Sequence, residues 1–201
     1  MRRFLVLGHK AASAPGFSLK DPAGTGGRVD VLARCWGAAL LVSHGLRADV
    51  ELYALHLGPP SAPKVVRVRA SGVRHLNPDE RSTLLLMEKA LGAPTTGPVW
   101  QESTPGVWVA VLSLVELLDE LAGSPLFLLD EAGDDVERVV VPADATFVLG
   151  DHVGFTPEEA AELAKRGARR ISVGPVSLQA DQCIVVLHNH LDRRSARSEQ
   201  G

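Results

Sequence analysis

The stretch Phe147-Val148-Leu149-Gly150-Asp151-His152-Val153-Gly154 passes from an apolar run into a turn that is bounded by two glycines. Residues 144–149, which run into this stretch, predict a buried strand. Thr156-Pro157-Glu158-Glu159 follows and predicts a helix start, because threonine can cap a helix, proline suits the first position and a glutamate stands three residues after the cap. A strand that leads through a short turn into a helix is the repeating unit of α/β proteins.

The same alternation continues on both sides of this unit. We expect strands at residues 3–8, 50–57, 65–68, 126–129 and 170–173, and helices at 28–42, 78–91, 112–122, 156–166 and 178–192. A loop at 10–27, a turn-rich segment at 93–98 and a frayed polar tail at 193–201 complete the chain. This order predicts an α/β fold with a mostly parallel sheet, in which ligands bind at the carboxyl ends of the strands.

Length and composition limit the class of protein. The chain has 201 residues, of which 45% are hydrophobic and 22% are charged, which is typical of one globular domain. Its only cysteines, Cys35 and Cys183, exclude a disulfide framework and a four-cysteine zinc site. The sequence predicts no membrane span, and the short apolar run near the start is a poor signal peptide. We therefore expect a reduced, cytoplasmic protein.

Charge is distributed unevenly along the chain. Residues 1–100 contain 13 Lys and Arg against 7 Asp and Glu, whereas residues 101–201 contain 8 against 17. A basic first half predicts a surface that binds a polyanion such as RNA. The alternative is an ordinary fluctuation of surface charge that folding mixes in space.

Three strand-to-turn junctions form the candidate ligand site, at residues 126–130, 147–154 and 171–178. Apolar side chains beside glycine-exposed backbone suit an adenine ring and a ribose. Gly150 and Gly154 could instead only turn the chain. The sequence has no dinucleotide-binding Gly-x-Gly-x-x-Gly after its first strand and no Walker A lysine motif, which argues against ordinary nucleotide enzymes.

Six short motifs carry a resemblance to a known family. They are, in order, Gly27-Arg28-Val29-Asp30 with Arg34-Cys35, Ser43-His44-Gly45-Leu46-Arg47, Pro78-Asp79-Glu80-Arg81, Ser103-Thr104-Pro105-Gly106, Leu149-Gly150-Asp151-His152-Val153-Gly154, and Ile171-Ser172 through Cys183. With them the chain resembles the archaeal tRNA pseudouridine N1-methyltransferases of the SPOUT superfamily, although its richness in Ala, Val, Leu and Arg also suits a bacterial member. The resemblance implies a C-terminal deep trefoil knot, bound S-adenosylmethionine, a homodimer, and methylation at position 54 in the T-loop of tRNA, with neither a metal nor a membrane involved.

The resemblance also assigns regions and residues. It makes the whole chain, 1–201, one SPOUT-like domain with a basic, RNA-facing part at 1–92 and a knotted, cofactor-binding part at 124–192. Arg28 and Asp30 face the target base, and Arg34, Arg47 and Arg81 are candidates for RNA phosphate contacts. The implied cofactor residues are Leu129, Leu149, Gly150, Val173, Gly174, Pro175, Val176, Ser177, Leu178 and Cys183.

The chemistry suits these residue types. Pseudouridine is attached through carbon, so its N1 carries a proton and can attack a methyl group once it is held at about 3–3.5 Å. A carboxylate near N1–H can orient the base or accept the proton, and we assign that role to Asp30. Asp30 could instead only complement the helix dipole. No covalent adduct is needed, so Cys183 need not be a thiolate and could be a small core residue.

Aromatic residues and histidines add weaker expectations. Trp36 lies on the apolar face of its helix and is expected in the core, whereas Trp108 is a candidate for base stacking. His188 and His190 are spaced poorly for a metal and are expected at a surface or an interface.

Three rival functions stay open at this stage. The same fold could methylate ribosomal RNA or another base. It could be a non-catalytic RNA-binding module, or an enzyme that acts on a small molecule at the same loops.

Overall fold

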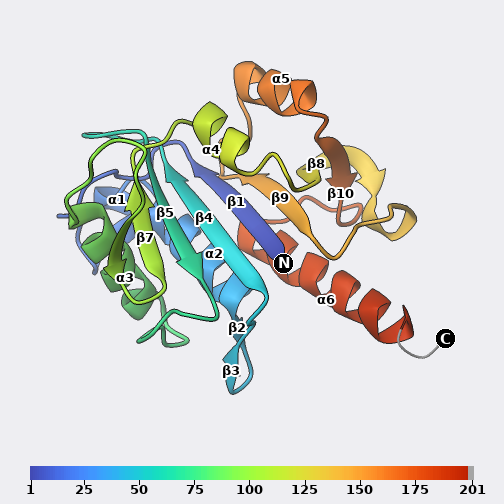
Figure 1. Ribbon diagram of the computed structural model, residues 1–201, viewed down its shortest axis with the longest axis horizontal. Coiled ribbons are helices and arrows are strands. Elements are labelled where there is room, and N and C mark those ends of the chain that lie inside the picture. Colours follow the sequence, from blue (N-terminus) through green and yellow to red (C-terminus); the bar gives the residue numbers. More distant parts are fainter. Residues whose placement is uncertain (199–201) are drawn as a thin grey trace.

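An eight-stranded sheet in the order β10-β8-β9-β1-β4-β5-β7-β6 organises residues 1–198, which the computed structural model describes (Figure 1). The five strands from β10 to β4 are parallel to their neighbours, and β5, β7 and β6 continue the sheet as antiparallel strands. The predicted α/β class with a mostly parallel sheet is therefore confirmed.

The strands of the parallel half are β10 (Arg169–Ser172), β8 (Leu126–Asp135), β9 (Ala145–Gly150), β1 (Arg2–Gly8) and β4 (Val50–His56). Those of the antiparallel half are β5 (Lys64–Arg69), β7 (Val107–Ala110) and β6 (Gln101–Thr104), while β2 (Leu41–Val42) and β3 (Gly45–Leu46) form a separate hairpin. The helices are α1 (Pro22–Thr25), α2 (Val29–Leu40), α3 (Glu80–Gly92), α4 (Leu114–Glu120), α5 (Pro157–Lys165) and α6 (Ala180–Ser198), with a 3-10 turn at Val136–Arg138.

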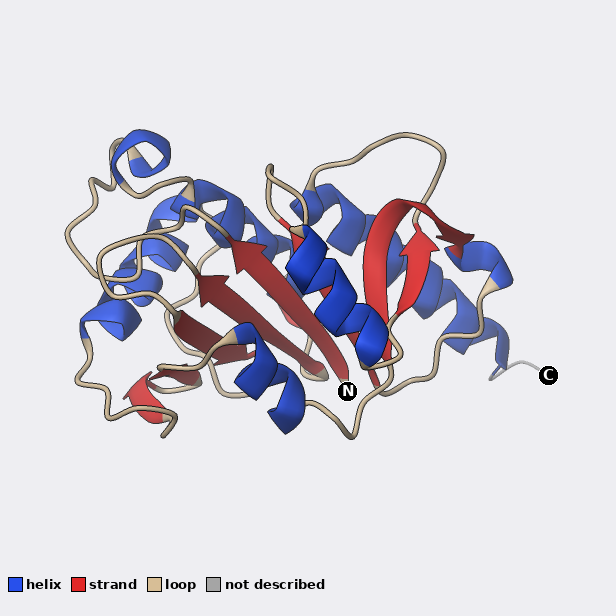
Figure 2. Ribbon diagram, turned by 90° about the horizontal axis from the view of Figure 1, so that it is seen from above, coloured by secondary structure: helices blue, strands red, loops and turns tan. Residues whose placement is uncertain are grey.

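Helices cover both faces of the sheet (Figure 2). Successive side chains of β1 point to opposite faces, as the pleat of a strand requires. Phe4 and Val6 pack in the core that contains α2, α3 and α6, whereas Leu5 and Leu7 pack in a second core with α4 and α5. A strand that is buried on both faces must be apolar throughout, which explains the unbroken apolar run in β1.

Several local expectations are confirmed and others are wrong. Thr156 caps α5 in a full capping box with Glu159, as the sequence predicts. Strands β6 and β7 were not predicted. β6 is a polar edge strand without an apolar pattern, and β7 is an apolar run of only four residues. The expected loop 10–27 contains the short helix α1, and β8 runs six residues beyond its expected end at residue 129.

The last helix corrects two expectations. It continues to Ser198 rather than ending near residue 192, and the rest of the tail expected to fray, 199–201, lies outside the described residues. His188 on this helix is buried within the chain and not at a surface. Its Nε2 bonds the carbonyl of Ala39 at 3.1 Å, and its Nδ1 lies 3.1 Å from a guanidinium nitrogen of Arg2. His188 thereby fastens α6 to the end of α2.

Candidate active site

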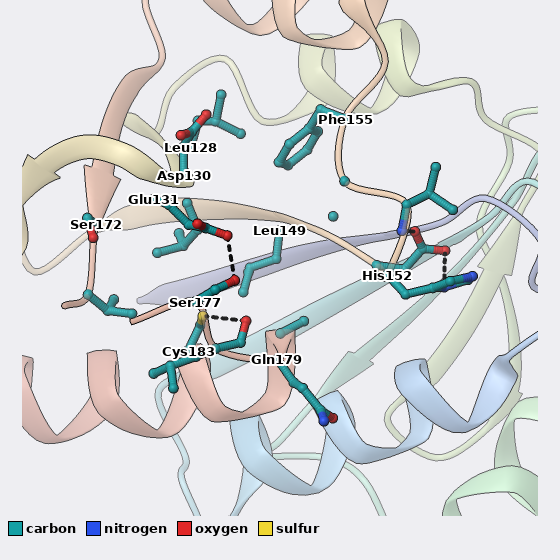
Figure 3. A pocket seen from close by; sticks show the side chains of 18 of the residues that line it. Leu128, Asp130, Glu131, Leu149, His152, Phe155, Ser172, Ser177, Gln179 and Cys183 are labelled. Carbon is teal, nitrogen blue, oxygen red and sulfur yellow. Dashed lines mark hydrogen bonds and ion pairs between the residues drawn. The ribbon is translucent and has the colours of Figure 1, made fainter. Parts of the chain in front are cut away.

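A cleft of about 950 Å³ lies at the carboxyl end of the parallel strands (Figure 3). Parallel strands place their carboxyl ends at one edge of the sheet, so the connections that follow β9 and β10 meet there beside β8. These two connections and residues 128–132 of β8 form one wall of the cleft. The start of α2 forms the other wall, and the first turn of α6 closes the space between them.

The turn after β9 is shaped by glycine. A Cβ at Gly150 would stand 2.6 Å from the carbonyl oxygen of Gly154, closer than such atoms approach in real proteins. A bridge between Asp151 and Gly154 closes the turn. A side chain at position 150 would therefore push the turn out of place and change the wall of the cleft.

Polar contacts cross the loop wall. The hydroxyl of Ser177, on the connection after β10, donates a hydrogen bond to the carboxylate of Glu131, on β8 (Figure 3). The thiol of Cys183 points to the carbonyl of Leu178, with 3.7 Å between sulfur and oxygen. Burial raises the pKa of the Cys183 thiol. Cys183 is thus a neutral thiol, consistent with chemistry that needs no thiolate nucleophile.

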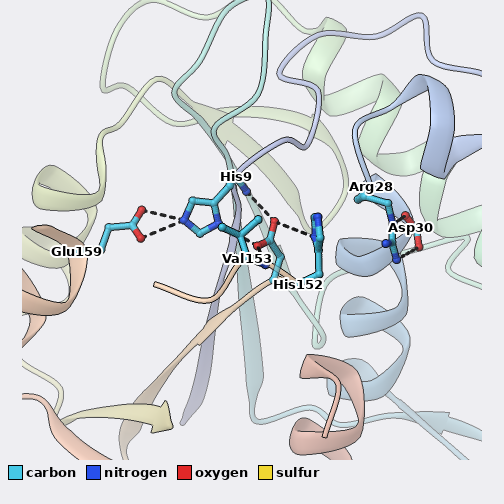
Figure 4. Close-up of polar contacts among 7 residues, drawn as sticks. His9, Arg28, Asp30, His152, Val153 and Glu159 are labelled. Atoms are coloured by element: carbon cyan, nitrogen blue, oxygen red, sulfur yellow. Dashed lines mark hydrogen bonds and ion pairs between the residues drawn. The ribbon is translucent and has the colours of Figure 1, made fainter. Parts of the chain in front are cut away.

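A carboxylate between two guanidinium groups supports the opposite wall, and Figure 4 shows Asp30 with one of them, Arg28. Asp30 accepts hydrogen bonds from Nε of Arg28 at 2.9 Å, from Nη2 of Arg28 at 3.1 Å and from Nη1 of Arg34 at 2.7 Å. Both arginines line the cleft, whereas Asp30 is 7% exposed and lies behind them. The backbone of Arg28 is left-handed, with φ of 71°, and turns its side chain back onto the helix start.

The two arginines decide the charge of Asp30. Burial, the largest single influence, raises the pKa of this carboxyl, but the hydrogen bonds and charges of Arg28 and Arg34 outweigh it and lower the pKa below its usual value. Asp30 is therefore ionised at neutral pH and is a weak base. It can orient an N–H donor more readily than it can take a proton away.

Comparison with known proteins decides the family. A family model described as "Putative SAM-dependent RNA methyltransferase" matches residues 1–196. The chain belongs to this family. The resemblance drawn from six short motifs is thus confirmed at the level of an S-adenosylmethionine-dependent RNA methyltransferase.

Similar curated proteins are archaeal. The chain is 45% identical over 204 residues to the tRNA (pseudouridine(54)-N(1))-methyltransferase of Methanosarcina acetivorans, covering 100% of this chain and 94% of that protein. It is 46% identical to the protein of the same name from Halobacterium salinarum, covering 96% of each. A crystal structure of Archaeoglobus fulgidus Nep1 bound to S-adenosylhomocysteine shares the fold, with a TM-score of 0.63, 16% identity and coverage of 96% of this chain and 98% of that one.

The methyltransferase brings most of the predicted cofactor residues together. The cleft is lined by Leu129, Leu149, Gly150, Val173, Gly174, Val176, Ser177, Leu178 and Cys183. Pro175 is exposed and is not among the lining residues of the described chain. It lies in the bend between Gly174 and Val176, both of which line the cleft.

The three predicted RNA contacts lie in different places. Arg34 lines the cleft of the methyltransferase. Arg47 follows the β2–β3 hairpin and bonds the carboxylate of Asp192 at 2.8 Å. Arg81 is exposed in the first turn of α3. Trp36 is fully buried, as expected, whereas Trp108 holds the guanidinium of Arg67 4.6 Å from its ring centre.

The sequence analysis missed a second ionic cluster beside the cleft. His9 follows β1 and lies between the carboxylates of Asp151 and Glu159 (Figure 4). One available signal was the place of His9 directly after a predicted strand, where parallel sheets gather functional residues. Its partners are more than 140 positions away in the chain, so the sequence could not reveal the cluster.

Among residues 1–198 there is no group of three or more His, Cys, Asp or Glu side chains arranged to hold a metal ion. None of the helices in this part of the chain is both long enough and apolar enough to cross a bilayer.

Proposed function

We propose that this protein transfers a methyl group from S-adenosylmethionine to N1 of pseudouridine at position 54 of tRNA. The observation that carries the proposal is the cleft itself, in which a wall of glycine-shaped loops faces a wall that carries Arg28 and Arg34 with Asp30 behind them. Relatives at 45% and 46% identity that bear the name of this activity support it.

The cleft fits the cofactor in size and in chemistry. Its volume of about 950 Å³ lies within the range of small-molecule sites. Leu149, Val173 and Leu178 offer apolar contacts for a flat base, and the Gly150 turn offers backbone without a side chain in the way. When bound there, S-adenosylmethionine supplies an electrophilic methyl group.

The chain's own residues hold the target base. An ionised Asp30 can accept a hydrogen bond from N1–H of pseudouridine and so aim N1 at the methyl group, and such orientation alone can accelerate a reaction strongly. As the N1–CH3 bond forms and the C–S bond to the methyl group breaks, the N1 proton passes to Asp30 or to water, and S-adenosylhomocysteine is the second product. Arg28 and Arg34 keep that carboxylate charged and can also contact a flanking phosphate. The base must leave its stack to reach the cleft, which costs a few kcal/mol and less in a loop.

Residues 1–92 are assigned as the RNA-facing part. Arg34, Arg47 and Arg81 are the proposed phosphate contacts, and the excess of basic over acidic residues in the first half supports this assignment. Arg47 is 21% exposed and would share its charge between Asp192 and RNA.

Two further features belong to the proposal. Residues 124–192 form the cofactor part, in which the chain after β10 passes through the connection after β8 as a trefoil knot. The protein is a cytoplasmic homodimer, for which the exposed side chains of Val176 and Val185 provide apolar surface. An experimental structure with an unthreaded C-terminal part would contradict the knot, and a monomeric mass in light scattering would contradict the dimer.

One experiment tests the reaction and its target. The purified protein is incubated with S-adenosylmethionine and with tRNA that carries either pseudouridine or uridine at position 54, and the nucleosides are identified by mass spectrometry. We expect N1-methylpseudouridine only from the first tRNA. Methylation of ribosomal RNA instead would assign another substrate, and binding of RNA without any methyl transfer would leave an RNA-binding module.

A further inference from the structure

His9 occupies a partly buried position between three structural elements beside the cleft. It directly follows β1, and its side chain is 14% exposed. Asp151 lies in the turn after β9, and Glu159 lies in the first turn of α5; their side chains are 3% and 15% exposed. The ring therefore joins the end of one strand to the turn after another and to a helix start.

Both nitrogens of the ring face carboxylate oxygens. Nδ1 lies 2.9 Å from Asp151, and Nε2 lies 3.0 and 3.2 Å from the two oxygens of Glu159 (Figure 4). A neutral imidazole has only one N–H and would set a lone pair against one carboxylate. Only the imidazolium, which donates from both nitrogens, matches this arrangement.

The two carboxylates also hold the backbone around them. Asp151 accepts hydrogen bonds from the backbone N–H of His9 at 2.9 Å and of Val153 at 2.9 Å. Glu159 accepts a hydrogen bond from the backbone N–H of Thr156 in the capping box of α5. Both ends of the segment 151–159 are thus bonded to the same ring, and its residues Asp151 to Phe155 line the cleft.

The charged groups around His9 favour its cationic form. Burial of the ring, the largest single influence, lowers the pKa of His9, but the hydrogen bonds and charges of Glu159 and Asp151 outweigh it and raise the pKa above its usual value. Two other groups face this cluster through Asp151: the imidazole of His152, with Nδ1 3.7 Å from the carboxylate, and the guanidinium of Arg28, whose charge Asp151 also stabilises. The ring is fully protonated below its ordinary pKa of 6.5 and loses its proton as the pH rises through the raised pKa.

We propose that His9 is a positioning residue of the methyltransferase. The imidazolium of His9 fixes the segment 151–159 against β1 and so makes cofactor binding dependent on pH. This inference rests on the proposed function for its ligand. Loss of the proton leaves one ring nitrogen as an acceptor facing a carboxylate. The segment then loses one hydrogen bond, and the wall of the cleft loosens.

The test measures cofactor binding and loop order separately. Calorimetry with S-adenosylmethionine and amide hydrogen exchange of residues 150–159 without it are compared from about pH 6 to about pH 9. We expect the wild-type affinity to be constant at the acidic end and to fall roughly tenfold at the alkaline end, with faster exchange in the segment. His9→Gln should bind roughly tenfold more weakly at neutral pH and lose this pH dependence.

Two further variants keep the test decisive. Glu159→Gln retains the helix cap but removes one carboxylate, so the alkaline fall in affinity should move to lower pH. His44→Asn replaces an exposed histidine of left-handed backbone by a residue that tolerates it, and should match the wild type.

Two results would overturn the inference: a wild-type affinity that does not change with pH, or a segment that exchanges equally slowly in wild type and His9→Gln. Failure of the proposed function gives a different pattern. The wild type would then show no heat of cofactor binding, while exchange of the segment would still differ between wild type and His9→Gln.

Discussion

Each wall of the cleft is supported by a cluster of three charged side chains, but the ratio of cations to anions is opposite in the two clusters. On the α2 wall, one carboxylate, Asp30, lies between two guanidinium groups. On the loop wall, one imidazole, His9, lies between two carboxylates. The first cluster holds an anion with cations that never titrate in the working range, whereas the second holds two anions with a cation that does.

Because of this difference, the charge of the α2 cluster is constant near neutral pH, whereas that of the loop cluster changes with pH. The α2 wall keeps its carboxylate ionised at any pH near neutrality, as the orientation of an N–H donor requires. The loop wall depends on one proton for its shape. The comparison therefore predicts that changes on the α2 wall alter turnover, whereas changes on the loop wall alter cofactor affinity.

The largest effect is expected at Asp30. Asp30→Asn retains the size of the side chain but removes the charge that orients N1–H, so turnover should fall roughly 100-fold at saturating cofactor and RNA. The affinity for S-adenosylmethionine should stay near that of the wild type. Single-turnover methylation and calorimetry measure the two quantities.

Asp192→Asn is a matched control for this experiment. Asp192 also lies between two arginines, Arg2 and Arg47, but away from the cleft. If Asp192→Asn lowers turnover as much as Asp30→Asn does, the effect comes from general loss of ion pairs, and Asp30 has no special part in the reaction.

A smaller effect, on cofactor affinity rather than on turnover, is expected at Gly150. A methyl group there would meet the backbone of Gly154, so Gly150→Ala should displace the turn and weaken cofactor binding by roughly tenfold. At saturating cofactor its turnover should be close to normal. Gly123→Ala, where the added carbon has no neighbour within 4 Å, should bind as the wild type does. Equal affinities for the two variants would show that the turn is not a rigid part of the wall.

The smallest effect is expected outside both walls, at His188, which joins α6 to the end of α2 and should make stability sensitive to acid. Burial, together with the charges of Arg47 and Arg2, lowers the pKa of His188 to about 4, so the folded protein holds this ring neutral. Unfolding lets the ring take up a proton below its ordinary pKa, so stability is present above about pH 6.5 and is lost as the pH falls toward 4. The loss should reach at most about 3 kcal/mol, measured by urea unfolding. If His188→Gln loses as much stability as the wild type when the pH falls through this range, His188 is not the cause.

Much of the fold was predictable because its signals are local. The apolar run of β1, the capping box at Thr156 and Glu159, and the helical spacing in α2 each lie within a few residues. The polar edge strand β6 gave no such signal, since its pairing with β7 and not its composition makes it a strand.

The candidate site was predictable only where its residues are close together in the sequence. The glycine-bounded turn at 150–154 and the pair Arg28 and Asp30 are close in sequence, and both line or support the cleft. The RNA contact proposed at Arg47 is bonded to Asp192, a partner that no local pattern could indicate.

Residue type and short-range spacing were sufficient to predict the α/β class and the strand-to-turn junctions, whereas the kind of chemistry came from the resemblance to a known family. Tertiary structure alone decided which charges meet. His9 and Glu159 are 150 positions apart, and Arg2 and Asp192 are 190 apart, yet each pair is in contact. The physical reason is that the order of strands in the sheet, which single stretches of sequence do not encode, decides which helices lie beside each end of β1.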